Sequence, residues 1–295
     1  MSDLLLPANL VGALLRLRLN PRGRRTARGR GERLAGRGGA STDLADYRDY
    51  SEGDDLRAID WNAFARLQRP YLRLYRLEED RHLVVLVDAS ASMAEAGKLE
   101  RARELAAALG AVGLASGDRV SLWCFGDAGD PRRQPPLRGL AMLPRWLAAC
   151  AAIVPSTGGE KALTPPEAVG RLLARHVGRG ACVLLSDFTH EGAPEPALTR
   201  LHAAGLDPLA IQVLAAAEVD PDPAADLRLV DAETGAELDV SIAGALPAYL
   251  AGLDHLRRRL AGACQARGGR FAAVTAEEPL APLLTDRLRR QGWFA

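Results

Sequence analysis

Several residue types that often carry function are scarce in this sequence. Of its 38 lysine and arginine residues, only Lys98 and Lys161 are lysines, so the positive charge is almost entirely arginine. The four cysteines lie far apart, with no CxxC pair and no spacing typical of a zinc site. We therefore expect buried free thiols and a protein of the reducing cytoplasm.

No apolar run approaches the eighteen residues that a membrane-spanning helix needs. The segment 4–19 is apolar, but it is interrupted by Pro7, Asn9, Arg16 and Arg18. Its arginines follow the apolar residues, which is the reverse of the order in a secretory signal peptide. We expect neither a transmembrane segment nor a signal peptide.

The net charge of +1 conceals a strongly basic beginning of the chain. The first 40 residues contain nine arginines against Asp3 and Glu32. We expect residues 1–41 to form a basic, partly flexible arm that opens with a short amphipathic helix within residues 1–20. Binding of nucleic acid through this arm is one alternative function, although residues 1–40 lack the aromatic side chains on which bases stack.

A dense polar and aromatic cluster follows the arm. Gly53, Asp54 and Asp55 are typical of a turn, and the alternation in residues 71–77 predicts a half-exposed strand. We assign residues 42–80 to a segment of its own, packed on the main domain. Both a structural role and a partner-binding role stay open for this cluster.

From residue 81 to residue 295 the pattern is that of an α/β domain, in which short apolar strands alternate with amphipathic helices. The sequence predicts strands over residues 83–87, 119–125, 181–187, 208–214 and 270–274. It predicts helices over residues 100–115, 140–153, 194–204 and 246–266, a helix that begins at residue 165, and a last helix near the end of the sequence. Residues 126–138 are expected to be a loop, and residues 227–230 and 237–242 a β-hairpin insertion. This alternation predicts a doubly wound, mostly parallel sheet flanked by helices.

Oxygen-bearing side chains follow two of these strands. Asp88, Ser90 and Ser92 come directly after the first apolar strand, and Asp187 ends another. Because the carboxyl ends of parallel strands lie at one edge of a sheet, these side chains are expected to converge there. Thr164 precedes the helix that begins at residue 165 and brings a hydroxyl to the same edge. A donor set of oxygens alone suits Mg²⁺.

The spacing of these residues resembles the metal-ion-dependent adhesion site (MIDAS) of von Willebrand factor A domains. The stretch before it is similar to a bacterial branch, the domain-of-unknown-function family 58 (DUF58). The residues that carry this second resemblance are Arg48, Tyr50, Gly53, Asp54, Asp55, Arg57, Ile59, Asp60, Trp61, Ala65, Arg66, Glu78, Asp88, Ser90, Ser92 and Met93, with Glu233-Thr234-Gly235 and Tyr249 further on.

The resemblance implies a von Willebrand factor A-like, Rossmann-type fold and a site for Mg²⁺ or Mn²⁺ built from Asp88, Ser90, Ser92, Thr164 and Asp187. In adhesion-site domains an acidic residue of the bound protein completes the metal shell. Members of the family are often encoded beside MoxR-type AAA+ ATPases, which implies an adaptor that works with such an ATPase. The family usually places its threonine in a Gly-Gly-Thr-Asp-Leu-like loop, so Thr157 remains an alternative to Thr164.

A metal-dependent hydrolase or phosphoryl-transfer enzyme is the other alternative. A haloacid-dehalogenase-like enzyme would need a second carboxylate where Ser90 stands, and the sequence contains no Gly-x-Ser-x-Gly elbow and no P-loop. His190 follows Asp187 closely enough to act as a base, but a single loop histidine is usually only solvated. We therefore expect a non-enzymatic protein-interaction module.

Overall fold

The computed structural model describes residues 5–20, 44–75, 81–126, 129–156, 163–190, 192–222, 226–230 and 237–295. The chain divides into two compact units, which are described separately below. The larger unit combines Met1–Arg25 with Arg81–Ala295, and the smaller unit is Thr26–Asp80.

The larger unit is built on a six-stranded sheet with the strand order β10-β7-β6-β3-β4-β5. All neighbouring strands are parallel except β5, which is antiparallel to β4. The strands are β3 (Arg81–Asp88), β4 (Arg119–Phe125), β5 (Arg132–Arg138), β6 (Arg179–Ser186), β7 (Leu206–Leu214) and β10 (Arg270–Thr275). The prediction of a doubly wound, mostly parallel sheet flanked by helices is confirmed.

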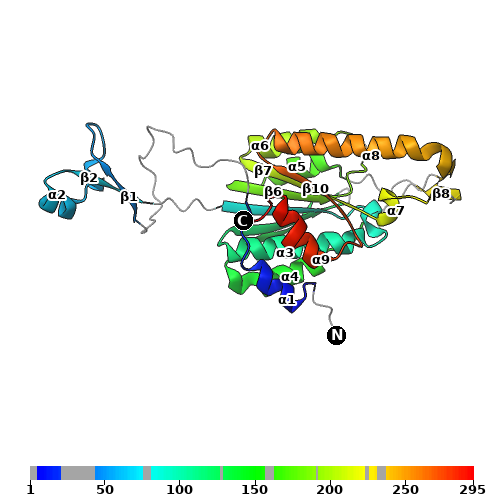
Figure 1. Cartoon of the computed structure of the whole chain (residues 1–295), viewed down its shortest axis with the longest axis horizontal. Helices are drawn as coiled ribbons and strands as arrows, with labels where there is room; N and C mark the ends of the chain where they lie inside the picture. Colours follow the sequence, from blue (N-terminus) through cyan, green and yellow to red (C-terminus); the bar gives the residue numbers. More distant parts are fainter. Residues whose placement is uncertain are drawn as a thin grey trace. The chain divides into compact units, whose positions relative to one another are not determined.

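Helices cover both faces of this sheet (Figure 1). One face carries α1 (Ala8–Leu14), α3 (Lys98–Ala115), α4 (Leu143–Ala151), α9 (Leu280–Pro282) and the π-helical turn η4 (Leu283–Leu288). The other face carries α5 (Pro165–Leu173), α6 (Glu195–Ala203) and α8 (Ile242–Gln265). The structure thus confirms the helices that the periodicity predicts, within a few residues at their ends.

Strand β3 lies in the middle of the sheet and shows why its sequence is a continuous apolar run. Leu83, Val85 and Val87 pack against the face of α1, α3 and α4, whereas Val84 and Leu86 pack against that of α5, α6 and α8. A strand buried on both faces needs apolar side chains at every position. Burying each of them stabilises the fold by roughly 1.5–3 kcal/mol relative to exposure.

Helices α3 and α4 approach closely at Gly110. A Cβ atom at this position would lie 2.0 Å from the Trp146 ring. The fully buried Trp146 fills this space, and its Nε1 donates to the carbonyls of Ala106 and Ala107 at 3.2 Å each. Since a buried indole N–H needs an acceptor, these contacts allow tryptophan to serve as a core residue here.

The expectation of a loop over residues 126–138 is wrong, because Arg132–Arg138 form strand β5. Pro135 and Pro136 obscure this strand in the sequence, since a proline cannot donate a hydrogen bond to a neighbouring strand. An edge strand pairs on only one side, and β5 pairs only with β4. The register also shifts between Val120 and Leu122, which accommodates the prolines.

The beginning and the end of the chain pack together in the larger unit. Leu6, Leu10 and Leu14 are buried in the core, as the predicted short amphipathic helix requires. Arg18 and Ala295 exchange two backbone hydrogen bonds of 3.2 and 2.8 Å. Residues 21–41 of the expected basic arm lie outside the described residues. No helix in the described part of the chain is long and apolar enough to cross a membrane.

The hairpin expected after residue 226 has its two strands in place. β8 (Asp226–Val230) pairs antiparallel with β9 (Glu237–Ser241). The connecting residues 231–236, including the Glu233-Thr234-Gly235 part of the resemblance, lie outside the described residues.

The smaller unit contains the antiparallel strands β1 (Leu44–Asp49) and β2 (Tyr71–Tyr75), the 3₁₀ turn η1 (Leu56–Ala58) and helix α2 (Trp61–Leu67). Asp60 caps α2, because its Oδ1 accepts from the backbone N–H groups of Asn62 and Ala63 at 3.0 and 3.1 Å. Its Oδ2 accepts from the Tyr47 hydroxyl at 3.1 Å. Trp61 itself remains 61% exposed. Part of the polar cluster therefore holds the local turns together.

Candidate functional site

The carboxyl ends of β3 and β6 meet at one edge of the sheet, as the sequence predicts. Val87 and Leu185 are the last residues that pair between β3 and β6, and Asp88 and Asp187 follow them by one and two residues. The chain after Asp88 is clamped on two sides, because Ala89 donates to the Phe125 carbonyl and accepts from Ser156 N–H, each at 2.7 Å.

Glycine is required where β4 ends beside this loop. A Cβ atom at Gly126 would lie 2.6 Å from the carbonyl oxygen of Ala89. Real Cβ contacts essentially never come so close, so a side chain here would displace the loop. Gly126 thus permits β4 to run directly against the residue that follows Asp88.

Ser90 and Ser92 fold back toward the strand end. The Ser90 N–H donates to Asp88 Oδ1 at 3.0 Å, and the hydroxyls of Ser90 and Ser92 lie 3.1 Å apart. The short 3₁₀ turn η2 (Ala91–Ala94) places both hydroxyls on the side of the carboxylates. Ser92 also hydrogen-bonds the Asp187 side chain. These four residues, Asp88, Ser90, Ser92 and Asp187, are called the strand-end cluster below.

Asp187 is a buried carboxylate with a cation of its own. Its Oδ2 accepts from Lys98 Nζ at 3.1 Å, and its Oδ1 accepts from the N–H and hydroxyl of Thr189 at 3.1 and 2.9 Å. Burial by itself would raise the pKa of Asp187, but the Lys98 charge and the hydrogen bonds from Thr189 and Ser92 outweigh it. The pKa of Asp187 is therefore lowered, and the group is held ionised.

Asp88 is buried equally deeply, but among the described residues it has no Lys or Arg partner. Its side chain is 0% exposed and accepts from Ser186 Oγ at 2.6 Å and from Ser90 N–H. Burial raises the pKa of Asp88, and the neighbouring Asp187 charge raises it further. Attraction to His190 and the two hydrogen bonds oppose this rise without cancelling it.

His190 lies above the two carboxylates. Its Nδ1 is 3.6 Å from Asp88 Oδ2, and its ring packs against Phe125 with 6.3 Å between ring centroids. One ligand atom each of Asp88, Asp187 and His190 lie within 4.8 Å of one another. The tight turn that brings His190 back includes Phe188 at φ +58°, held by a 2.9 Å hydrogen bond from its N–H to Ser186 Oγ.

Thr164 stands apart from the strand-end cluster in its contacts. It is the N-cap of α5, as predicted, and its hydroxyl and N–H both donate to Glu167 Oε2 at 2.9 Å. Within the described ranges no hydrogen bond or ion pair joins Thr164 to the cluster. The hydroxyl oxygen keeps its acceptor lone pairs, so its assignment as a metal ligand stays a prediction. Thr157 lies outside the described residues.

The sequence did not predict the charged residues that pair with Asp187 and with its partner Lys98. Lys98 also donates to Glu218 Oε1 at 2.8 Å, and the other oxygen of Glu218 accepts from Ala215 N–H at 2.6 Å. Gln212 Nε2 donates to the Asp187 carbonyl at 3.0 Å. One signal was available, since Lys98 is one of only two lysines in an arginine-rich chain.

The donor set fits a divalent cation. In the described part of the chain, Asp88, Asp187 and Glu218 are three carboxylates, and Lys98 is the one ammonium paired among them. The excess of two negative charges equals the charge that a divalent ion supplies. Asp88, Ser90 and Ser92 offer oxygens, which hard cations such as Mg²⁺ prefer.

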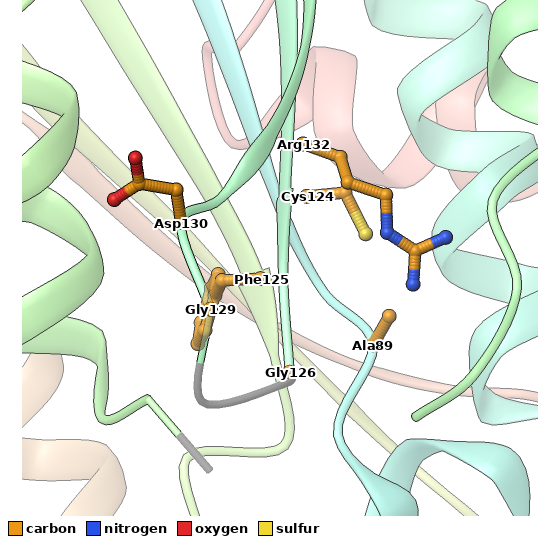
Figure 2. A pocket seen from close by; sticks show the side chains of 7 residues that line it. All are labelled: Ala89, Cys124, Phe125, Gly126, Gly129, Asp130 and Arg132. Atoms are coloured by element: carbon orange, nitrogen blue, oxygen red, sulfur yellow. The ribbon is translucent and has the colours of Figure 1, made fainter. Parts of the chain in front are cut away.

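A small pocket adjoins the loop at Ala89 (Figure 2). Figure 2 shows the Arg132 guanidinium on the Ala89 side of the pocket and the Asp130 carboxylate on the opposite side. Asp130 pairs with Arg171 and Arg175 at 3.3 and 2.6 Å. Arg132 is exposed and lines this pocket together with Ala89, the residue that follows Asp88.

Two solved structures are similar to this chain. The conserved hypothetical protein BatB from Bacteroides thetaiotaomicron is 17% identical with a TM-score of 0.46, over 72% of this chain and 98% of that one. An aerotolerance-related membrane protein from Bacteroides fragilis is 15% identical with a TM-score of 0.43, over 71% of this chain and 97% of that one.

Among curated sequences, uncharacterized proteins of Mycobacterium bovis and Mycobacterium tuberculosis are 28% identical over 224 residues. The aligned region covers 70% of this chain and 66% of each relative, so the chain spans just under two thirds of their length. The family described as "Protein of unknown function DUF58" matches residues 46–249, and the chain belongs to this family.

Proposed function

We propose that this protein is a non-enzymatic interaction module that binds an acidic partner through Mg²⁺ or Mn²⁺ held by a MIDAS-type site. The ligands are Asp88, Ser90 and Ser92, with Thr164 and Asp187 directly or through water. The observation that carries the proposal is the fully buried Asp88, which has no Lys or Arg ion pair among the described residues.

An uncompensated buried carboxylate is costly, because taking its charge out of water loses several kcal/mol of hydration. Asp187, at the same edge, is compensated by Lys98. A cation beside Asp88 restores the balance, and the cluster around it brings the two hydroxyls that complete an oxygen shell. Mg²⁺ uses only one or two protein carboxylates and keeps open positions for water or a partner ligand.

The chemistry of the partner follows from the surroundings of the site. An ion held by a nearly balanced cluster attracts a further oxygen anion, and the exposed Arg132 carries a positive charge in the pocket that Ala89 also lines. This favours a carboxylate of another protein as the last ligand. Because members of the DUF58 family are often encoded beside MoxR-type AAA+ ATPases, such an ATPase is the first candidate.

The compartment proposed for this interaction is the cytoplasm. Its support is the state of the cysteines, since all four are buried thiols outside any disulfide bond. Burial raises the pKa of Cys182 to about 12, which makes this thiol unreactive at neutral pH.

Thermal unfolding with and without metal tests the proposal. At a free Mg²⁺ concentration 100 times the dissociation constant, the folded state gains about 2.7 kcal/mol. We expect Asp88→Ala to abolish this gain and Asp254→Asn, which changes an exposed aspartate of α8, to keep it. The absence of any stabilisation of the native protein by millimolar Mg²⁺ or Mn²⁺ would contradict the proposal.

A second experiment addresses the partner. Native protein and Asp88→Ala are used to capture proteins in Mg²⁺ and in chelator, and a purified MoxR-type ATPase is tested in the same way. A partner bound through the metal is lost both in the variant and in chelator. A partner that binds equally well in all conditions would show that the interaction does not use this site.

A further inference from the structure

His190 is almost completely enclosed, yet its ring makes no hydrogen bond to any described residue. Its side chain is only 9% exposed, and within the described part of the chain neither ring nitrogen has a hydrogen-bond partner. An imidazole carries two nitrogens that bond in any protonation state. Leaving such groups unpaired in the interior costs about 1–3 kcal/mol each, so the arrangement calls for a ligand.

The ring is also held in one orientation. Phe125 packs against it, while the turn at Phe188 fixes the backbone on the other side. This packing keeps Nδ1 directed at Asp88, 3.6 Å from Oδ2. The separation is too long for a hydrogen bond but suits two atoms that bind the same ion.

The spacing of the three donors fits one metal ion. Their ligand atoms all lie within 4.8 Å of one another. Metal–nitrogen and metal–oxygen distances are roughly 2.0–2.4 Å, so two donors on one ion are at most about 4.8 Å apart. A single cation between Asp88, Asp187 and His190 therefore requires little movement of their side chains.

We propose that His190 is a nitrogen ligand of the cation at Asp88, so that the site prefers a borderline transition metal such as Co²⁺ or Zn²⁺ over Mg²⁺. The inference rests on the proposed metal site and adds the identity of the ion. Imidazole suits these borderline metals, whereas Mg²⁺ favours oxygen donors and near-ideal octahedral geometry. Thus one buried nitrogen ligand makes a site of oxygen donors selective for borderline metals over Mg²⁺.

The nearest competing explanation is a simple ion pair between a protonated His190 and Asp88. In that case the histidine would repel a metal, and its removal would strengthen or leave unchanged the binding of every ion. Ligation predicts the opposite, a loss confined to the metals that accept nitrogen. The two explanations therefore predict opposite changes in Co²⁺ affinity when His190 is replaced.

Calorimetric titration of the tag-free native protein with Mg²⁺, Mn²⁺ and Co²⁺ tests the inference. His190→Gln and His190→Phe are compared with the native protein, and His202→Gln, which changes an exposed histidine of α6, is the matched control. We expect the native protein to bind Co²⁺ at least tenfold more tightly than Mg²⁺. Both His190 variants should lose about 10- to 100-fold for Co²⁺ while Mg²⁺ affinity changes by less than about threefold.

A spectroscopic measurement can detect the nitrogen ligand directly. Pulsed electron paramagnetic resonance of the Mn²⁺-loaded native protein should show coupling to one imidazole nitrogen, and this coupling should vanish in His190→Gln. If Mg²⁺ and Mn²⁺ bind and depend on Asp88, but no nitrogen coupling appears or Co²⁺ affinity survives in both variants, the role of His190 is overturned and the metal site stands. If no ion binds the native protein, both proposals fail.

Discussion

The two ends of strand β3 carry buried ionisable side chains that differ in what surrounds them. At its beginning, His82 is 4% exposed and lies beside His176, with 4.7 Å between ring centroids. Burial, followed by the positive charges of His176 and Arg119, lowers the pKa of His82 to about 4. At the other end, Asp88 is buried beside a second carboxylate, and its pKa is raised. Both shifts favour the neutral form.

The two groups differ in their charge at pH 7 and in the charges that surround them. His82 is neutral at pH 7 in any case, so its burial among positive groups costs little there. Asp88 is negative at pH 7 in water and must lose its charge, or gain a cation, to be buried. Asp187 shows what such a cation does, because Lys98 holds it ionised at the same depth. The comparison identifies Asp88 as the group that a ligand ion would stabilise.

The largest expected effect comes from Lys98→Met. Removing the ammonium leaves Asp187 buried without its cation, which should destabilise the protein by about 3 kcal/mol in urea unfolding. The exposed Glu100→Gln on the same helix should change stability by less than about 0.5 kcal/mol. Combining Lys98→Met with Asp187→Asn should recover part of the loss. A cost below about 1 kcal/mol for Lys98→Met would show that the buried pair is not the support inferred here.

The next effect concerns pH and the beginning of β3. Between pH 6.5 and 4, His82 is protonated in the unfolded chain but stays neutral in the folded protein. Its contribution to the free energy of unfolding is therefore fully present above pH 6.5 and is lost as the pH drops toward 4. We expect this loss to amount to about 2–3 kcal/mol and to be missing in His82→Phe when both proteins are unfolded in urea at a series of pH values. The exposed His202→Gln serves as the control and should follow the native curve. Parallel curves for His82→Phe and the native protein would refute a neutral buried His82.

In chelator, replacing Asp187 and replacing Asp88 by asparagine should change the stability of the protein in different directions. Asp187→Asn removes one of the two carboxylates that pair with Lys98 and should destabilise the protein by about 2 kcal/mol. Asp88→Asn removes a charge that has no Lys or Arg partner among the described residues and should leave stability unchanged or raise it by up to about 1 kcal/mol. Denaturant titration of both variants in chelator measures the difference. Equal losses in the two variants would remove the distinction between the strand ends.

The smallest effect is expected at Ser186. Its hydroxyl donates to Asp88 and accepts from Phe188 N–H, so Ser186→Ala should cost about 1 kcal/mol. Ser121 on β4 of the same sheet offers a matched control, because it is also buried and its hydroxyl has no hydrogen-bond partner among the described residues. Ser121→Ala should be neutral or slightly stabilising. A Ser186→Ala variant as stable as Ser121→Ala would show that the bond to Asp88 contributes nothing net.

Local signals were sufficient for most of the sheet and its helices. The buried strands are continuous apolar runs, and Thr164 with Glu167 gives an explicit helix start. The edge strand β5 escaped prediction, because its prolines argue against a strand unless its place at the edge is known. Chain order does not tell which strand lies at an edge.

By itself, the sequence determined the doubly wound sheet and the convergence of Asp88 and Asp187, since parallel strands bring their carboxyl ends to one edge. Only the tertiary structure decided that Asp187 has Lys98 as its cation, whereas Asp88 has none among the described residues. The physical reason is that burial and pairing depend on groups far apart in the chain, such as Lys98 from α3 and Glu218 from beyond β7. The enclosure of the His190 ring without a hydrogen bond to any described residue was decided in the same way.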